Sequence, residues 1–166
     1  LIGTLMPARR KDVLIQTKVS DRDPDVWWSM LETSLKRLNV DYVDTLLIHQ
    51  LGRDNDLAKL ERKGGVLEQL YKAREQKLAR WIGFSSHTDG TTAAKFIRRH
   101  DIDAVQMAIN VATDGPYDFG HEERALPAAV EKGIGIIAMK VMGQDNIANK
   151  YDEFDAATCL RYSLSL

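Results

Sequence analysis

The stretch "YVDTLLIHQL" (residues 42–51) carries the clearest signal of the fold. Residues 43–48 are almost all apolar, and the run then stops at His49 and Gln50. An apolar run of this length predicts a strand that is buried on both faces, as in a parallel sheet covered by helices. Because polar groups are costly to bury unless they are paired or used, the end of this strand is a candidate site.

Strand-like and helix-like stretches alternate on both sides of this segment. This pattern is typical of βαβ units that build a parallel sheet. The predicted strands are residues 12–18, 42–49, 79–86, 102–110 and 134–140, and the predicted helices are residues 21–39, 64–78, 87–100, 120–133 and 154–166. Residues 52–65 and 110–119 are expected to be the long irregular connections.

The first predicted helix carries signals at both ends. Asp23 can cap it, Pro24 fits its first position, and Asn39 can end it. Its apolar residues recur at helical spacing and should share one face. They are Trp27, Met30, Leu31, Leu35 and Leu38.

Two architectures fit the alternation: an open doubly wound sheet, or part of an eight-stranded (β/α)8 barrel. The glycine-rich fingerprint of dinucleotide-binding doubly wound folds does not follow the first strand, which favours the barrel. A whole barrel needs about 250 residues, whereas this chain has 166. We therefore expect residues 1–166 to form a single domain, a partial (β/α)8 barrel of about five βα units, truncated at both ends.

Composition limits the class of protein. Apolar residues make up 44%, charged residues 28%, and the net charge is -1, which indicates a globular domain and gives no reason to expect nucleic acid as a partner. The single cysteine, Cys159, excludes a disulfide framework. No apolar run reaches the roughly 20 residues of a membrane helix, and the first residues do not resemble a signal peptide. We expect a cytoplasmic protein that does not bind membranes; its oligomeric state is left open.

Polar residues end all five predicted strands. In a parallel barrel the carboxyl ends of the strands open onto one face, where active sites lie. Five polar strand ends together are therefore a stronger signal of a site than any of them alone. The residues are Lys18, His49, Gln50, Ser85, Ser86, His87, Gln106, Asn110 and Lys140.

Each of these residues has a structural interpretation as well. His49 could be a satisfied structural histidine, Ser85 and Ser86 could cap the next helix, and Lys18 could extend past the rim of the sheet. We expect no metal site, because no acidic strand end joins the two histidines. The run "GFSSH" also lacks the glycine–serine–glycine spacing of a hydrolase nucleophile.

Taken together, these motifs resemble the aldo-keto reductase family. "IQTK" resembles its lysine-bearing strand and "DYVDTLLIH" the strand of its active-site histidine. "ARWIGFSSH" and "DAVQMAIN" resemble the strands that hold the nicotinamide carboxamide. "KGIGIIAMKVMG" and "LRYSLSL" resemble the seventh strand and the helix after it. The motifs occur in the family's order and cover essentially the whole chain.

The resemblance implies a (β/α)8 barrel that reduces aldehydes and ketones with NADPH (or NADH). It implies that Lys18 and His49 are two members of a catalytic Asp–Tyr–Lys–His tetrad. It assigns carboxamide binding to Ser85, Ser86 and Gln106, with Asn110 as a further candidate. Met139 takes the position where the family often stacks a tyrosine on the nicotinamide, and Lys140 follows it. The partner would be a small carbonyl substrate.

The departures from the family leave alternatives open. No tyrosine of this chain matches the family's proton donor, so we expect that residues 1–166 alone do not turn over. Met139 and Lys140 also allow a barrel that binds a nicotinamide cofactor as a sensor or regulatory subunit. A lyase or aldolase that uses Lys18 or Lys140 as a Schiff-base amine is a third interpretation.

Overall fold

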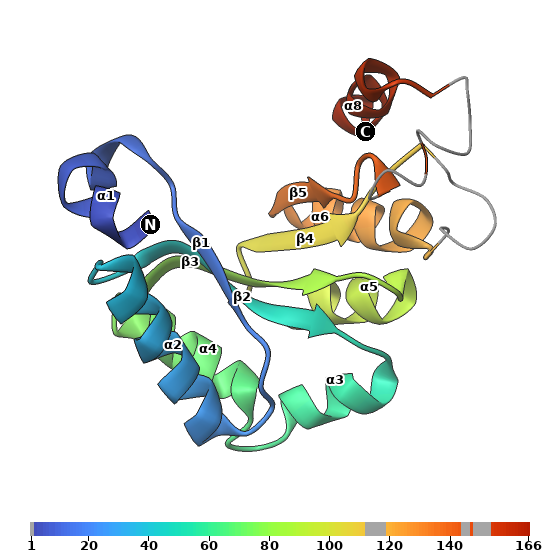
Figure 1. Cartoon of the computed structure of the whole chain (residues 1–166). Coiled ribbons are helices and arrows are strands. Elements are labelled where there is room, and N and C mark those ends of the chain that lie inside the picture. Colours follow the sequence, from blue (N-terminus) through green and yellow to red (C-terminus); the bar gives the residue numbers. More distant parts are fainter. Residues whose placement is uncertain (1, 112–118, 144–146, 148–153) are drawn as a thin grey trace.

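The computed structural model describes residues 2–111, 119–143, 147 and 154–166, and it contains a five-stranded parallel sheet (Figure 1). Neighbouring strands in the sheet are also consecutive in the chain, in the order β1-β2-β3-β4-β5, and every pair is parallel. The strands are β1 (Gln16–Val19), β2 (Val43–Leu51), β3 (Ala79–Ser86), β4 (Ala104–Ala108) and β5 (Gly135–Met139). All five predicted strands are confirmed.

At least one helix follows each strand in the chain. The helical elements are α1 (Ile2–Arg9), η1 (Arg10–Asp12), α2 (Pro24–Leu38), α3 (Asp54–Glu61), α4 (Val66–Glu75), α5 (Gly90–Arg99), η3 (His121–Ala125), α6 (Leu126–Lys132) and α8 (Ala156–Ser165). This succession of βα units with strands in chain order is the arrangement of a (β/α)8 barrel, and the predicted fold class is confirmed.

Helix α2 begins and ends where the sequence predicts. The Asp23 carboxylate accepts hydrogen bonds from the N–H groups of Asp25 and Val26 at 3.0 and 3.1 Å. Asn39 ends the helix with a left-handed backbone, at φ 54°. The predicted apolar face is confirmed for the fully buried Trp27 and Leu31, whereas Met30 is 37% exposed. Met30 therefore lies at the edge of the buried stripe.

Removing the cap of α2 is expected to lower stability modestly. Asp23→Ala leaves two N–H groups of the first turn without their acceptor, and the free energy of unfolding should fall by about 1 kcal/mol. Asp23→Asn, which keeps an acceptor oxygen, should stay near the wild type in the same denaturant titration. Equal stabilities for Asp23→Ala and Asp23→Asn would contradict the capping role.

The prediction of an irregular connection at residues 52–65 is wrong, because this segment contains α3. Asp54 and Asp56 lie in its first turn, where negative charge is favourable, and Leu57 and Leu60 are buried one helical turn apart. The surrounding charged residues hid this short amphipathic pattern. Most of the second predicted connection, residues 112–118, lies outside the described residues.

The predicted helix over residues 120–133 begins as a π-helical turn, η3, and continues as α6. Pro127 lies at the start of α6 and has no N–H to donate, so the regular hydrogen-bond pattern begins afresh there. Gly133 ends α6 with a left-handed backbone at φ 67°, as the sequence predicts.

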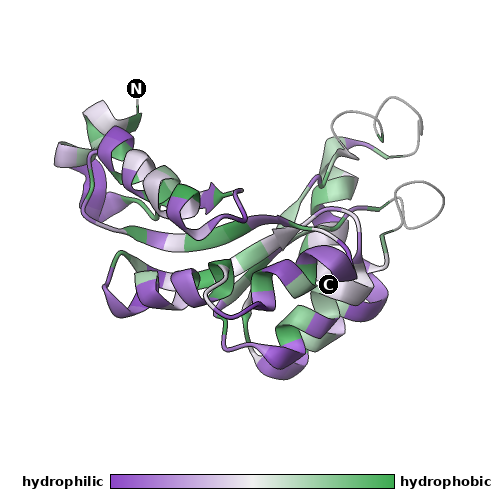
Figure 2. Ribbon diagram, turned by 90° about the horizontal axis from the view of Figure 1, so that it is seen from below, coloured by the Kyte–Doolittle hydropathy of each residue, from purple (hydrophilic) through white to green (hydrophobic). Residues whose placement is uncertain are grey.

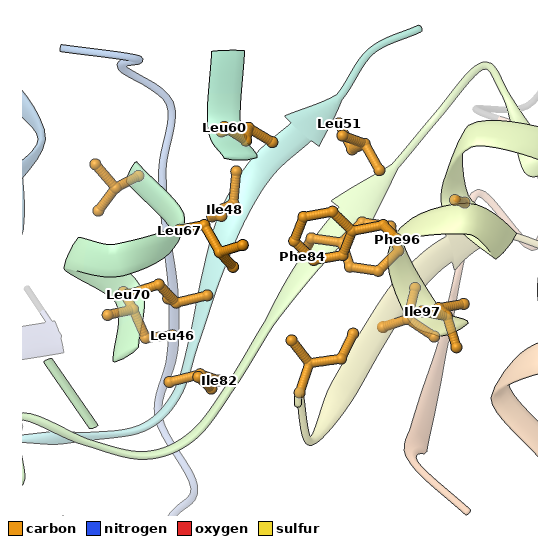
Figure 3. Close-up of a cluster of buried hydrophobic side chains, with 14 of the residues drawn as sticks. Leu46, Ile48, Leu51, Leu60, Leu67, Leu70, Ile82, Phe84, Phe96 and Ile97 are labelled. Carbon is orange, nitrogen blue, oxygen red and sulfur yellow. The ribbon is translucent and has the colours of Figure 1, made fainter. Parts of the chain in front are cut away.

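Strand β2 lies at the centre of the core and is buried on both faces. Leu46 and Ile48 point toward the helices, whereas Leu47 points to the opposite face, and all three are fully buried. Figure 3 shows the helix-side cluster, in which side chains of β2 and β3 meet those of α3, α4 and α5. Phe84 of β3 packs on Phe96 of α5 with ring centroids 4.8 Å apart. Figure 2 shows hydrophobic residues concentrated along the strands, with hydrophilic residues on the outer surfaces of the helices.

The face of the sheet opposite the helices is more open toward the amino ends of its strands. Trp81 of β3 is 38% exposed there and lines an open cavity of about 340 Å³ together with residues of β2, β4 and β5. In a complete barrel, side chains from all eight strands fill this interior. The described residues therefore form part of a barrel wall whose inner face is not filled by their own side chains.

Candidate active site

Lys18 and Gln106 meet on the inner face of the sheet, although β1 and β4 are separated by two other strands. The Lys18 ammonium donates a hydrogen bond to Gln106 Oε1 at 2.9 Å, and Gln16 donates to the same oxygen at 3.2 Å. Four neighbouring strands of a flat sheet would place β1 and β4 roughly 14 Å apart. The sheet must therefore curl, and these side chains lie on its concave face.

His49 is placed on the concave face by an irregularity at the end of β2. The pairing of β2 with β3 shifts register between Ile48 and Leu51, and Gln50 has a left-handed backbone at φ 56°. This bulge lets both Ile48 and Leu51 bury on the helix side while His49 points the other way. The ring of His49 meets that of His87 edge to face, with centroids 6.1 Å apart.

Among the described residues, the charges that act on His49 and His87 are positive. Burial lowers the pKa of Lys18 below its ordinary value. Burial also lowers the pKa of His49, and the positive charges of Lys18 and Arg22 lower it further. Burial lowers the pKa of His87 as well, together with the charges of Lys140 and Lys18. These shifts favour the neutral form of both imidazoles at pH 7, in which each can donate from one nitrogen and accept at the other.

Ser85 lies beside Gln106 in the register of β3 and β4, so the two side chains share the concave face. Ser85 is fully buried, and its Oγ accepts a hydrogen bond from the N–H of Gln50 at 2.9 Å. This bond links the end of β3 to the bulge that carries His49. The bond uses the Ser85 oxygen as an acceptor, and the hydroxyl keeps its capacity to donate.

Ser86 is not brought together with these residues. Because side chains alternate along a strand, Ser86 points to the helix side, opposite to Ser85. There it is fully buried and lies 3.0 Å from Nε2 of His121, the first residue of η3. The sequence did not suggest His121, since nothing in the pattern shows that η3 packs against the end of β3.

Met139 and Lys140 end β5 beside β4. Met139 pairs with Ala108 in the register that also places Ile137 opposite Gln106, so Met139 shares the concave face. Lys140 has a left-handed backbone at φ 56°, and its carbonyl accepts a hydrogen bond from Gly143 at 2.7 Å. The strand thus ends in a tight turn at Lys140. Asn110, beyond the end of β4, is buried.

Sequence reasoning missed Arg22 and Asp56, which form a bidentate ion pair beside His49. Arg22 Nε and Nη2 donate to the two carboxylate oxygens of Asp56, each at 2.8 Å. Both lie in polar stretches that follow strand ends, β1 for Arg22 and β2 for Asp56. The available signal was an arginine three residues beyond the end of the strand that carries Lys18.

The residues that the structure describes include no group of three or more His, Cys, Asp or Glu side chains able to hold a metal ion. Among the same residues, every helix is too short or too polar to cross a bilayer.

The parallel βα units are those of a (β/α)8 barrel, and Lys18, Ser85 and Gln106 share its concave face near the carboxyl ends of the strands. The model of the Aldo/keto reductase family matches residues 1–159, and the chain belongs to that family. It is 30% identical over 131 residues to "Probable aldo-keto reductase 1" of soybean (Glycine max), a match that covers 76% of this chain and 33% of that protein.

Solved aldo-keto reductases share the fold. A Klebsiella pneumoniae aldo-keto reductase in complex with NADPH superposes with a TM-score of 0.71 at 19% identity. The match covers 99% of the present chain and 56% of the Klebsiella chain. The silkworm (Bombyx mori) aldo-keto reductase in complex with NADP gives a TM-score of 0.60 at 22% identity. This match covers 84% of the present chain and 47% of the silkworm chain. The chain thus spans about a third of the soybean relative and about half of these solved chains.

Proposed function

We propose that the complete protein carrying this chain reduces aldehyde or ketone carbonyls by hydride transfer from NADPH (or NADH). The observation that carries the proposal is the meeting of Lys18, Ser85 and Gln106 on one concave face, beside His49. Membership of the family supports it, as do the NADP and NADPH complexes of the structural relatives.

The residues present fit the carboxamide of a nicotinamide. A carboxamide offers one acceptor oxygen and two N–H donors, and it needs complementary groups at short range. The Ser85 hydroxyl can donate to the oxygen. The Gln106 side chain can donate from its amide NH2, since its Oε1 already accepts from Lys18 and Gln16. When bound, the cofactor would supply the hydride.

Lys18 and His49 would act on the carbonyl oxygen. In the family, a tyrosine donates the proton to this oxygen, and a nearby ammonium such as that of Lys18 makes the phenol a stronger acid. A neutral His49 can donate a hydrogen bond that orients the carbonyl. The three tyrosines among the described residues lie elsewhere: Tyr42 before β2, Tyr71 on α4, and Tyr162 on α8, where it bonds to Glu122.

The remaining predicted residues have different places in this proposal. Met139 would pack against the nicotinamide ring, and Lys140 would bring positive charge to the end of β5. Ser86 was expected to bind the carboxamide as well. Its contact with His121 on the helix side supports instead a role in fixing the end of β3.

Ser85→Ala is expected to weaken NADPH binding. The variant removes the hydroxyl offered to the carboxamide and the acceptor of the Gln50 N–H, so the Kd for NADPH should rise about 5- to 10-fold. Fluorescence titration of the complete protein with NADPH measures it. Ser29→Ala, on the exposed surface of α2, is the control and should leave the Kd unchanged. A wild-type Kd in Ser85→Ala would remove Ser85 from the site.

The function itself is tested by mixing the complete protein with NADPH or NADH and a panel of aldehydes and ketones. The proposal expects consumption of the reduced cofactor that depends on the carbonyl compound and yields the matching alcohol. A protein that binds NADPH tightly yet reduces none of these compounds would contradict the proposal.

That outcome would favour a second candidate, a barrel that binds a nicotinamide cofactor as a sensor or regulatory subunit. The observation behind it is Met139 on the concave face at the end of β5, where the family often places an aromatic ring. The presence or absence of a tyrosine and an aspartate ahead of Lys18 in the complete protein separates the two candidates.

A further inference from the structure

Arg22, in the turn between β1 and α2, uses all three guanidinium nitrogens in hydrogen bonds. Its Nη2 donates to the carbonyls of His49 and Gln50 at 3.2 and 3.0 Å, and its Nη1 donates to that of Ser20 at 2.9 Å. Its Nε and Nη2 also bind Asp56, as described above. A single side chain thus joins the end of β1 to the end of β2.

Asp56 completes this connection from α3. Besides Arg22, its carboxylate accepts the N–H of Gly52 at 2.9 Å, so it also holds the chain that leaves β2. The side chains of Arg22 and Asp56 are only 21% and 19% exposed. A bidentate, partly buried guanidinium–carboxylate pair fixes orientation far better than an exposed ion pair does.

The backbone that Arg22 holds is strained. A left-handed conformation is unfavourable for a residue other than glycine, and Gln50 adopts it at φ 56°. Its N–H is held by Ser85 and its carbonyl by Arg22, so surrounding side chains maintain the bulge from both sides. Because this bulge directs His49 to the concave face, its support also determines where the imidazole points.

We propose that Arg22, oriented by Asp56, is a positioning residue for His49: it holds the bulged end of β2 and keeps a positive charge beside the imidazole. The catalytic consequence rests on the proposed carbonyl reduction, whereas the effect on His49 does not. The charged and titratable groups that act on His49 are Lys18 from β1, Arg22 from the turn after it, and His87 from the end of β3.

Two conservative replacements separate the two effects of Arg22. Arg22→Lys keeps the positive charge, but a single ammonium cannot reproduce the planar guanidinium that binds three carbonyls and both carboxylate oxygens. Arg22→Gln loses both the charge and the guanidinium. Asp56→Asn keeps the charge of Arg22 but weakens the bidentate pair that orients the guanidinium. Arg62→Gln, an exposed arginine after α3, is the matched control.

The experiment measures kcat and KM for carbonyl reduction by the complete protein, together with the NMR titration of the His49 imidazole, assigned with His49→Gln. Arg22→Lys and Arg22→Gln should both lower kcat about 10- to 100-fold, with little change in the KM for NADPH. Asp56→Asn should show a smaller loss of kcat. The pKa of His49 should rise in Arg22→Gln, because a positive neighbour is lost, and stay near the wild-type value in Arg22→Lys.

Two results would overturn the inference. One is a wild-type kcat in Arg22→Lys, and the other is a His49 titration in Arg22→Gln that matches the Arg62→Gln control. If the wild-type protein proves not to reduce carbonyls, the proposed function fails, and the NMR titration still decides whether Arg22 acts on His49. If Arg22 only stabilised the fold, Arg22→Lys, Arg22→Gln and Asp56→Asn would all lower stability without changing the pKa of His49.

Discussion

Replacing Lys18 by methionine in the complete protein is expected to lower kcat for carbonyl reduction by about 10²- to 10⁴-fold. Methionine keeps most of the side chain's length but removes the ammonium that lies 2.9 Å from Gln106 on the concave face. Without that charge, a phenol serving as proton donor would return toward its ordinary pKa of about 10. Proton transfer to the carbonyl oxygen would then be slow at neutral pH.

Steady-state kinetics of Lys18→Met and Lys63→Met test this expectation. Lys63 is exposed between α3 and α4, so its replacement changes the net charge equally without touching the strand ends. The KM for NADPH should change much less than kcat in Lys18→Met. A Lys18→Met enzyme within a few-fold of Lys63→Met in kcat would exclude Lys18 from the chemistry.

Asp44→Ala is expected to cause the largest loss of stability, about 3–5 kcal/mol in the free energy of unfolding. Asp44, near the start of β2, is 1% exposed. Its carboxylate accepts the Ile15 N–H at 2.8 Å and pairs with Arg10 at 3.0 Å and Arg80 at 3.1 Å. Alanine leaves all three donors without this partner. Asp12→Ala, at an exposed ion pair with Arg9, should cost less than about 1 kcal/mol in the same denaturant titration.

The contribution of Asp44 should also depend on pH. Burial raises the pKa of Asp44, but the Ile15 N–H, Arg10 and Arg80 lower it more, so its folded value lies below the ordinary one. A carboxyl with a lowered folded pKa stabilises the fold above its unfolded pKa of about 3.9, and this contribution is lost as the pH falls through the folded value. The stability gap between wild type and Asp44→Ala should therefore be constant near pH 7 and narrow below about pH 4. A gap that is the same at all pH values would mean that the charge of Asp44 is not what stabilises the fold.

The elements that the sequence predicts well are those with strong local signals. Asp23, Pro24 and Asn39 mark α2 at both ends, and the apolar runs mark every strand. Helix α3 was missed because its buried face consists of only Leu57 and Leu60 among charged residues. Local pattern is weak where a short helix is held by tertiary contacts rather than by its own propensity.

The candidate site was predictable as a set of strand ends but not in its details. Parallel topology brings polar strand ends to one face, and the structure places Lys18, His49, Ser85 and Gln106 there. Two adjacent residues of a strand point to opposite faces, so only one of Ser85 and Ser86 can face inward. The sequence alone does not show which of the two it is. The role of Arg22 depends on a bulge at Gln50, and no residue type in this stretch marks a left-handed backbone as a glycine would.

The most direct test of carbonyl reduction at these strand ends is isotope transfer. The complete protein is incubated with an aldehyde and NADPH that carries deuterium as the transferable hydrogen on the nicotinamide, and the alcohol is analysed by mass spectrometry. If the proposed function is correct, the alcohol carries one deuterium on the former carbonyl carbon, and its rate of formation falls together with kcat in Lys18→Met. Alcohol without deuterium, or no alcohol while NADPH is bound, would contradict it.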